Sequence, residues 1–226
     1  ADGQKVVIAD AVKFGGGMGS ALHDGAPSGK PRWQEAARYW VEFVGAPESA
    51  YNPDWDEDSA DVTSRPLYAN WQGVDAYISL HSNAFNGGTR GTGTWRYDGS
   101  NSSYPITEGS NELRNYIQKE IVDAIRAEWD PGWYDYGLHT ANFGELRVLD
   151  EAPGALLELG FHDNAEDAAW LLKPYFRETV ARAITKAVFR YFGVSAPLPP
   201  RRIRNIQTEV ATPGSVRLSW QPQPET

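Results

Sequence analysis

The chain has 226 residues and a mass of 25.0 kDa, enough for one sizeable core or for one domain and a fragment. Its content of 41% hydrophobic and 23% charged residues is typical of a folded protein, and no apolar run approaches the ~18 residues that cross a bilayer. A formal net charge of −9 argues against nucleic acid as a partner, because phosphates require a basic face. The absence of cysteine excludes a disulfide scaffold, a thiol nucleophile and a thiolate-bound metal.

The N-terminal part of the sequence predicts a strand, a loop and one helix. The β-branched run at 5–9 is typical of a strand, and the glycine-rich stretch at 15–19 of a flexible loop. Apolar residues recur at helical spacing over 31–43, with proline at the start, and the Gly-Ala-Pro sequence at 45–47 ends this helix. Residues 48–63 are rich in aspartate and glutamate and predict a solvated loop.

The central part predicts two strands and the strongest helix of the chain. Residues 75–80 indicate a buried strand that runs directly into His81. A short strand is expected at 94–97, between loops rich in glycine, threonine and other turn residues. Residues 111–129 carry an apolar stripe at helical spacing, for which Ser110 is the expected N-cap.

The C-terminal part predicts a buried strand followed by two helices. Residues 154–161 are apolar on both faces, as in a sheet that is covered by helices on each side. Asn164 is expected to cap a helix with acidic residues in its first turn, and a last helix over 176–192 ends at Gly193. The alternation predicts an α/β fold with a mixed, mostly parallel central sheet flanked by helices on both faces, and a short all-β C-terminal fragment.

The charge changes at a proline-rich stretch near the C-terminus. Residues 196–226 carry four Arg and two Glu, whereas residues 1–195 carry 17 basic and 28 acidic side chains. The Ala-Pro-Leu-Pro-Pro sequence at 196–200 cannot continue a helix and is typical of a stiff linker. We therefore expect a domain boundary at this stretch.

Two polar residues in the buried strands are candidates for chemistry. Glu158 lies inside an apolar strand, where a carboxylate is either ion-paired for structure or positioned for proton transfer. His81 lies at the end of a buried strand, where α/β sheets gather ligands, although a lone histidine there is more often structural. From the residues alone, both interpretations stay open for each position.

Three blocks of sequence resemble the zinc-dependent N-acetylmuramoyl-L-alanine amidases. Residues 65–84 contain an Arg, an Ala-Asn pair and a strand that ends in Ser-Leu-His-Ser-Asn-Ala, close to the family's Ser-Ile-His-x-Asn-Ala. Residues 137–147 are similar to the family's Gly-Val-Lys-x-Ala-Asn-Phe-x-Val-Leu-Arg, and 156–164 to its Leu-Val-Glu-x-Gly-Phe-x-x-Asn. The resemblance covers residues 65–192 and implies hydrolysis of the amide between N-acetylmuramic acid and L-alanine in peptidoglycan.

The resemblance also implies a role for individual residues. His81 matches a zinc ligand, and Glu158 matches the catalytic glutamate that takes a proton from zinc-bound water and returns it to the leaving amine. Asn83, His139 and Asn142 are assigned to substrate binding, with His139 at a position where the family often has lysine.

The remaining zinc ligands have two possible origins. The family's first ligand is a histidine in a Gly-His-Gly turn, which this sequence lacks, and its second is a glutamate on the next helix. Glu35 is the candidate for the second ligand, with His23 twelve residues before it. Alternatively, both ligands precede Ala1, because residues 6–12 also resemble the last strand of a carbohydrate-binding-like module that interrupts xanthan-lyase-like amidases.

The expected organisation therefore has four parts. Residues 1–30 are expected to hold a strand and a glycine-rich loop, which under the second alternative are the end of an upstream β module. Residues 31–195 are expected to form the amidase-like domain. The linker at 196–200 leads to residues 201–226, which resemble the first two strands of a fibronectin type III domain, with Trp220 as the core tryptophan of the second.

Three functions are open at this point. The first is a secreted or periplasmic zinc amidase that acts on peptidoglycan or a related wall glycan. The second is an amidase fold without metal that binds cell-wall or other polysaccharide through its many Trp and Tyr rings. The third is a polysaccharide-degrading enzyme with paired carboxylates, in which Glu158 requires a second acid at ~5–9.5 Å.

Overall fold

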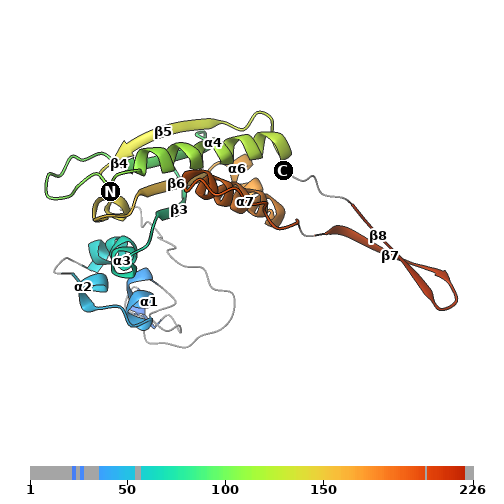
Figure 1. Cartoon of the computed structure of the whole chain (residues 1–226), viewed down its shortest axis with the longest axis horizontal. Helices are drawn as coiled ribbons and strands as arrows, with labels where there is room; N and C mark the ends of the chain where they lie inside the picture. Colours follow the sequence, from blue (N-terminus) through green and yellow to red (C-terminus); the bar gives the residue numbers. More distant parts are fainter. Residues whose placement is uncertain (1–21, 24–25, 28–35, 54–56, 202, 222–226) are drawn as a thin grey trace.

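The fold was analysed in a computed structural model of the whole chain (Figure 1). The structure describes residues 22–23, 26–27, 36–53, 57–201 and 203–221. The strand expected at 5–9, the glycine-rich loop and Glu35 lie outside these residues. Within the described part of the chain, no helix is both long and apolar enough to span a membrane.

The centre of the fold is a four-stranded sheet that is mixed, as the sequence predicts, although its strand at 135–141 was not expected. The strands are β3 (Tyr77–Asn83), β4 (Thr92–Tyr97), β5 (Asp135–Ala141) and β6 (Gly154–Phe161), and their order in the sheet is β3-β6-β4-β5. Strands β3 and β6 are parallel, β4 and β5 are parallel, and β4 runs antiparallel to β6. The apolar strand β6 therefore lies inside the sheet.

Two long helices cover one face of the sheet. Helix α4 (Ser110–Glu128) and helix α7 (Pro174–Tyr191) lie next to each other along this face (Figure 1). Between them and β6 lies the main core, in which Leu157 and Leu159 pack with apolar residues of both helices. The short helix α6 (Ala165–Leu171) follows β6, and Asn164 caps it as expected by accepting bonds from the backbone amides of its first turn.

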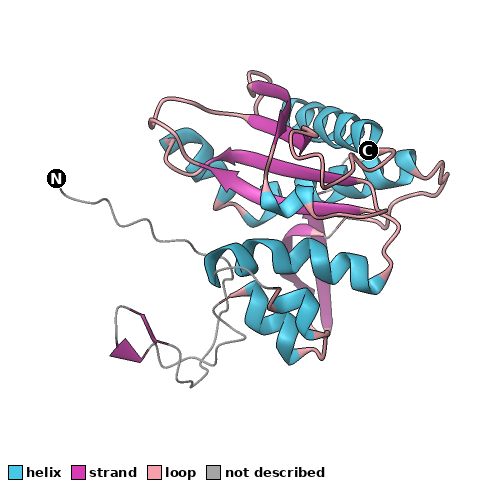
Figure 2. Cartoon of the chain, turned by 90° about the vertical axis from the view of Figure 1, so that its left-hand side faces the viewer, coloured by secondary structure: helices cyan, strands magenta, loops and turns pink. Residues whose placement is uncertain are grey.

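Smaller helices cover part of the opposite face. Helix α3 (Glu57–Gln72) and the single turn α5 (Gly144–Arg147) form a second core there, to which Leu156 of β6 belongs. Helices α1 (Ala37–Phe43) and α2 (Glu48–Tyr51) pack on α3 and not on the sheet (Figure 2). The alternation of β6 thus places even-numbered side chains toward α3 and α5, and odd-numbered ones toward α4 and α7.

The prediction of a loop at 48–63 is wrong, since α2 and the first half of α3 occupy this segment. Acidic residues suit the first turn of a helix because they interact favourably with its dipole, and α3 begins at Glu57. The buried residues of α3 are mostly small, among them Ala60, Thr63 and Ser64, so its helical face lacks a stripe of large apolar side chains.

The start of α4 also differs from the expectation. Gly109, with a φ of 79°, occupies the N-cap, and no side chain caps the helix. Ser110 is instead the first helical residue, and its hydroxyl accepts the backbone N–H of Gly154 at 2.9 Å. Its role is therefore to join α4 to the start of β6.

The C-terminal part is an antiparallel hairpin of β7 (Arg204–Thr212) and β8 (Ser215–Gln221), which projects from the α/β domain (Figure 1). Its assignment to a fibronectin type III domain and the domain boundary before it stay predictions. A second hairpin is formed near the N-terminus by β1 (Leu22–His23) and β2 (Ala26–Pro27).

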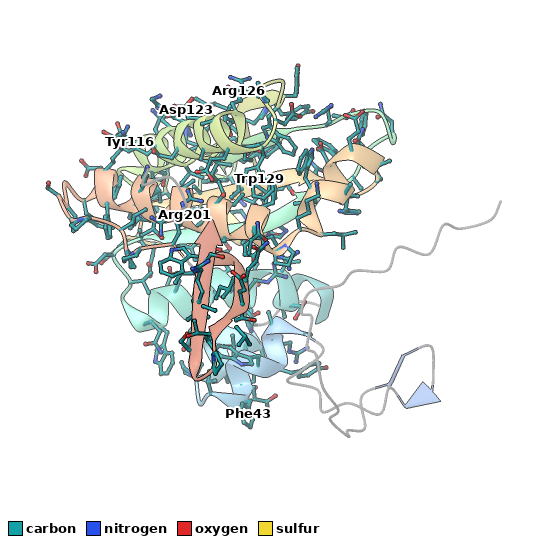
Figure 3. All side chains as sticks on the ribbon, turned by 90° about the vertical axis from the view of Figure 1, so that its right-hand side faces the viewer. Phe43, Tyr116, Asp123, Arg126, Trp129 and Arg201 are labelled. Atoms are coloured by element: carbon teal, nitrogen blue, oxygen red, sulfur yellow. The ribbon has the colours of Figure 1, made fainter. Side chains whose placement is uncertain are left out.

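The proline-rich stretch contacts the α/β domain. Arg182 donates to the Pro199 carbonyl at 2.6 Å. Arg201, whose side chain is only 4% exposed, donates to Glu128 of α4 at 2.8 Å and lies at the base of the hairpin (Figure 3). A buried ion pair thus fixes the residue at the base of the hairpin to the domain.

Candidate active site

Glu158 and His81 lie side by side on one face of the sheet. The two residues are Cα partners in the parallel pairing of β3 and β6. Partners in a ladder point to the same face, so the two side chains meet on the side of α3 and α5. The sheet therefore brings together the two residues that the sequence singles out for chemistry, although 77 positions separate them in the chain.

The carboxyl group of Glu158 is in an environment that favours its protonated form. Burial raises its pKa to about 7, and the negative charge of Glu145 adds to this effect. Its Oε2 atom is buried and has no hydrogen-bond partner among the described residues. A buried carboxyl group that titrates near neutral pH can take up and release a proton, which general acid–base chemistry requires.

Sequence reasoning missed Glu145, which the turn α5 holds close to both residues. Its Oε1 atom lies 4.0 Å from Nε2 of His81 and 3.9 Å from a guanidinium nitrogen of Arg65 on α3. The Oγ of Ser79 lies 2.7 Å from the same Nε2 atom. The signal for Glu145 was its acidic side chain at a position where the resembled family segment has valine.

The donor set around His81 fits one part of a zinc site. His81 supplies an imidazole, which suits Zn²⁺ as a ligand. Glu158 supplies a buried carboxyl oxygen without a hydrogen-bond partner among the described residues, which suits a zinc-bound water molecule. Three His, Asp or Glu side chains arranged to hold a metal do not occur among the described residues. Glu35 lies outside those residues, and for His23 the structure describes the backbone of β1 alone.

The residues predicted for substrate binding are spread over the sheet. Asn83 ends β3 two residues after His81, and its side-chain oxygen accepts the backbone N–H of Ala84 at 2.8 Å. His139 lies on β5, separated from β6 by β4. Asn142 follows the same strand and accepts a bond from Arg147 at 2.9 Å. Asn83 is thus near His81 in the chain, and its Cα partner in the ladder is Phe161 of β6.

Aromatic rings flank Glu158 on the side of β4. Gly93 of β4 is its partner in the antiparallel ladder, and Trp95 and Tyr136 lie over this glycine. A Cβ at Gly93 would come within 2.7 Å of the Trp95 indole and 2.9 Å of the Tyr136 ring. The imidazole of His139 stacks on Trp95, with 4.7 Å between the ring centroids. Glycine at position 93 therefore lets an aromatic layer lie flat on the strand beside the carboxyl group.

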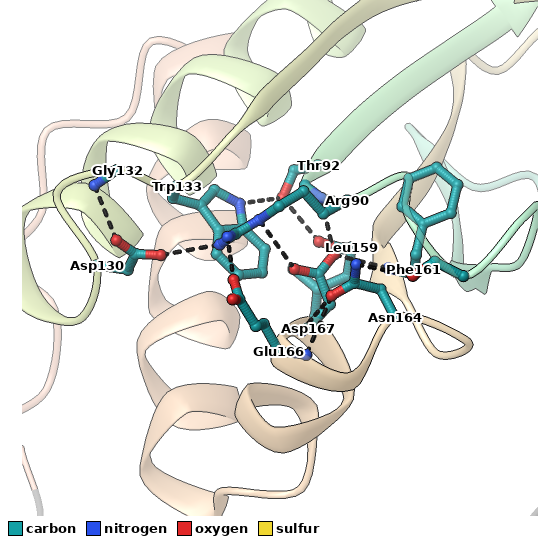
Figure 4. Close-up of polar contacts among 12 residues, drawn as sticks. Arg90, Thr92, Asp130, Gly132, Trp133, Leu159, Phe161, Asn164, Glu166 and Asp167 are labelled. Atoms are coloured by element: carbon teal, nitrogen blue, oxygen red, sulfur yellow. Dashed lines mark hydrogen bonds and ion pairs between the residues drawn. The ribbon is translucent and has the colours of Figure 1, made fainter.

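A polar network fixes the loops at the C-terminal ends of β3 and β6 (Figure 4). The fully buried Asp167 accepts the backbone N–H groups of Gly91 and Phe161 at 2.7 and 3.0 Å. Arg90 donates to Asp130 at 3.0 Å and also pairs with Glu166. The network connects the segment after β3 to α6, so the strand ends beside Glu158 are held in place.

The comparisons with known proteins identify the family of this domain. Residues 50–190 match the family described as N-acetylmuramoyl-L-alanine amidase. The chain belongs to this family. The matched region contains His81, Glu145 and Glu158, so the paired residues lie inside the amidase domain.

Three relatives show the extent of the similarity. The chain is 32% identical to the N-acetylmuramoyl-L-alanine amidase CwlM of Bacillus licheniformis over 62% of its own length and 49% of that protein. It is 31% identical to an uncharacterized cell wall amidase of Bacillus anthracis, over 63% of this chain and 26% of that protein. A solved N-acetylmuramoyl-L-alanine amidase from Clostridium difficile 630 has 26% identity and a TM-score of 0.51, over 60% of this chain and 67% of that one. The chain therefore spans half or less of these two curated relatives.

Proposed function

We propose that this amidase-family chain hydrolyses the amide bond between N-acetylmuramic acid and L-alanine in peptidoglycan, with Glu158 as general base and then general acid. The observation that carries the proposal is the buried, unpartnered carboxyl oxygen of Glu158, next to His81 in the sheet. A carboxyl group with a pKa of about 7 accepts a proton from the attacking water and returns it to the leaving amine without a large energy cost in either direction.

Zinc is the cofactor that this proposal includes. When bound, Zn²⁺ acidifies a water molecule and polarises the scissile carbonyl group. His81 would be one of its ligands, and a catalytic zinc site usually has three protein ligands. The further ligands are either Glu35 with His23, or residues that precede Ala1 in a longer protein. Secretion or a periplasmic location follows from the substrate, because peptidoglycan lies outside the cytoplasmic membrane.

A second candidate function is a polysaccharide-binding module with the amidase fold. It is favoured by the aromatic layer beside Glu158, in which the imidazole of His139 stacks on Trp95. A module of this kind binds cell-wall glycan and does not cleave it.

Product analysis on purified sacculi tests both candidates. The amidase proposal predicts new amino groups on L-alanine, no new reducing sugar ends, and loss of the activity with a chelator that added zinc restores. New reducing ends would indicate a glycosidase and contradict the proposal. Binding to sacculi without any product, by a chain that binds zinc tightly, would favour the binding module.

Zinc titration by calorimetry distinguishes the two origins of the ligands. If Glu35 is a ligand, the wild type binds tightly, and both Glu35→Ala and His81→Ala weaken binding. If the ligands precede Ala1, the chain binds zinc weakly and neither substitution has a large effect, because one imidazole is insufficient. Tight binding that depends on His81 and not on Glu35 contradicts both versions.

A further inference from the structure

The segment between β3 and β4 is a loop that hydrogen bonds hold in place near His81 and Glu158. It covers residues 84–91 and begins three residues after His81. One carboxylate oxygen of Asp163, in the turn after β6, accepts the backbone N–H groups of Phe85 and Gly87, both at 2.9 Å. The hydrogen bond from Gly87 is the main cause of the lowered pKa of Asp163. The carboxylate is therefore stabilised in its ionised form, which accepts both bonds.

Further bonds fix the rest of the loop. The side-chain amide of Asn164 donates to the Gly87 carbonyl at 3.2 Å. Within the loop, the side-chain oxygen of Asn86 accepts the amides of Gly88 and Thr89 at 2.9 and 2.8 Å. At its end, the loop is held by the backbone N–H of Gly91, which donates to Asp167 at 2.7 Å. The ion pair of Arg90 with Glu166 adds to this (Figure 4). Nearly every residue of this short loop thus has a fixed backbone position.

The loop presents one large apolar side chain to solvent. Phe85 is 76% exposed, and no contact of its ring with another aromatic ring occurs among the described residues. A single exposed apolar residue on a surface is common and needs no explanation. Here, however, the backbone under the ring is held by Asp163, and Phe85 follows His81 by four residues, so their Cα atoms are at most ~14 Å apart. A ring whose backbone is held in advance near a site binds a ligand with a smaller loss of backbone entropy than a ring on a free loop.

We propose that Phe85 is a glycan-binding residue, which stacks on a saccharide ring of the peptidoglycan strand during recognition of the substrate. This inference rests on the proposed function. The scissile amide joins a sugar acid to L-alanine, and of these two sides only the saccharide has a face of C–H groups as broad as a phenyl ring. The methyl group of L-alanine is too small to cover an exposed ring, so the saccharide side of the substrate is the side that Phe85 fits.

Calorimetric titration with soluble, peptide-free oligosaccharides of N-acetylglucosamine and N-acetylmuramic acid tests the inference. We expect Phe85→Ala to weaken binding by roughly threefold to tenfold, the range of an aromatic stacking contact, and Phe85→Trp to preserve it. Tyr116→Ala is the matched control, because Tyr116 is 37% exposed on α4, on the other side of the sheet (Figure 3). Equal affinity of the wild type and Phe85→Ala, or no binding of these oligosaccharides by the wild type, would overturn the inference.

Two further arms separate the possible outcomes. Asp163→Ala should release the loop, seen as faster hydrogen exchange at the amides of Phe85 and Gly87, and weaken glycan binding although the ring is still present. A free L-alanyl stem peptide should bind equally to wild type and Phe85→Ala, and a loss of peptide affinity instead would contradict the saccharide assignment. These titrations require neither hydrolysis nor zinc. If the chain binds glycan through Phe85 and has no amidase activity, the proposed function is refuted and the role of Phe85 stands.

Discussion

Removing the ionisable group of Glu158 should stabilise the metal-free protein, and more so at high pH. Burial and the charge of Glu145 raise the pKa of Glu158 from 4.5 to about 7. Below both values the group is protonated in the folded and unfolded states and does not affect stability. Between them the folded state binds more protons, so its stability falls as the pH rises, and above pH 7 the full penalty is present.

The size of this penalty follows from the pKa difference. A carboxyl group with these two values would destabilise the folded state by about 3 kcal/mol at alkaline pH. Since the Glu158 side chain is partly exposed, solvent screening reduces this to about 1–2 kcal/mol. The substitution Glu158→Gln keeps the shape and removes the charge. We therefore expect its stability advantage over the wild type to grow by about 1 kcal/mol between pH 5.5 and pH 8.5.

Urea unfolding of both proteins with a chelator present measures this difference. The chelator is necessary because a bound cation would favour the ionised carboxylate. Glu151→Gln, at an exposed position in the loop before β6, is the matched control and reports the effect of removing one surface charge. An advantage of Glu158→Gln that is independent of pH, or that shrinks as the pH rises, would refute the assigned environment of Glu158.

Three other substitutions test packing and polar contacts elsewhere in the fold. Arg201→Ala should lower the free energy of urea unfolding by about 3–5 kcal/mol, because it leaves the partly buried Glu128 without its cationic partner. Arg217→Ala in the exposed hairpin should lower it by less than about 1 kcal/mol. Equal effects of the two substitutions would contradict the buried ion pair. Gly93→Ala should lower the unfolding free energy by about 1–3 kcal/mol and change the near-UV circular dichroism, because the added Cβ would come within 2.7 Å of the Trp95 indole. An unchanged spectrum would exclude that packing of the ring on Gly93. Asn164→Ala should lower the unfolding free energy by about 1–2 kcal/mol through loss of the α6 cap, and an unchanged value would show that the cap is dispensable.

The elements with strong apolar patterns were predictable from the sequence. Strand β6 has the expected bounds of 154–161, because it is apolar on both faces, and α4 differs from its expected range by one residue at each end. Helix α3 was not predictable, because its buried residues are mostly small and form no stripe of large apolar side chains. Its helical form depends on contacts with α1, α2 and α5, which the local sequence does not reveal.

The candidate site was predictable in its residues and not in its geometry. His81 and Glu158 were identified because each is a polar residue in a buried strand and because their surroundings resemble a family. Their positions side by side depend on the register of β3 against β6, which tertiary packing sets. Glu145 enters the site only because α5 folds back over the sheet face, so no local pattern indicated its contact with His81.

The most direct test of the account is the rate of amino-group release from purified sacculi by wild type and Glu158→Gln at the same zinc content. If Glu158 transfers the proton, the variant retains its fold and its bound metal and loses about 10²–10⁴-fold in rate. Glu151→Gln, treated in the same way, should release amino groups at the wild-type rate. Unchanged turnover in Glu158→Gln would remove Glu158 from the mechanism and contradict the central claim.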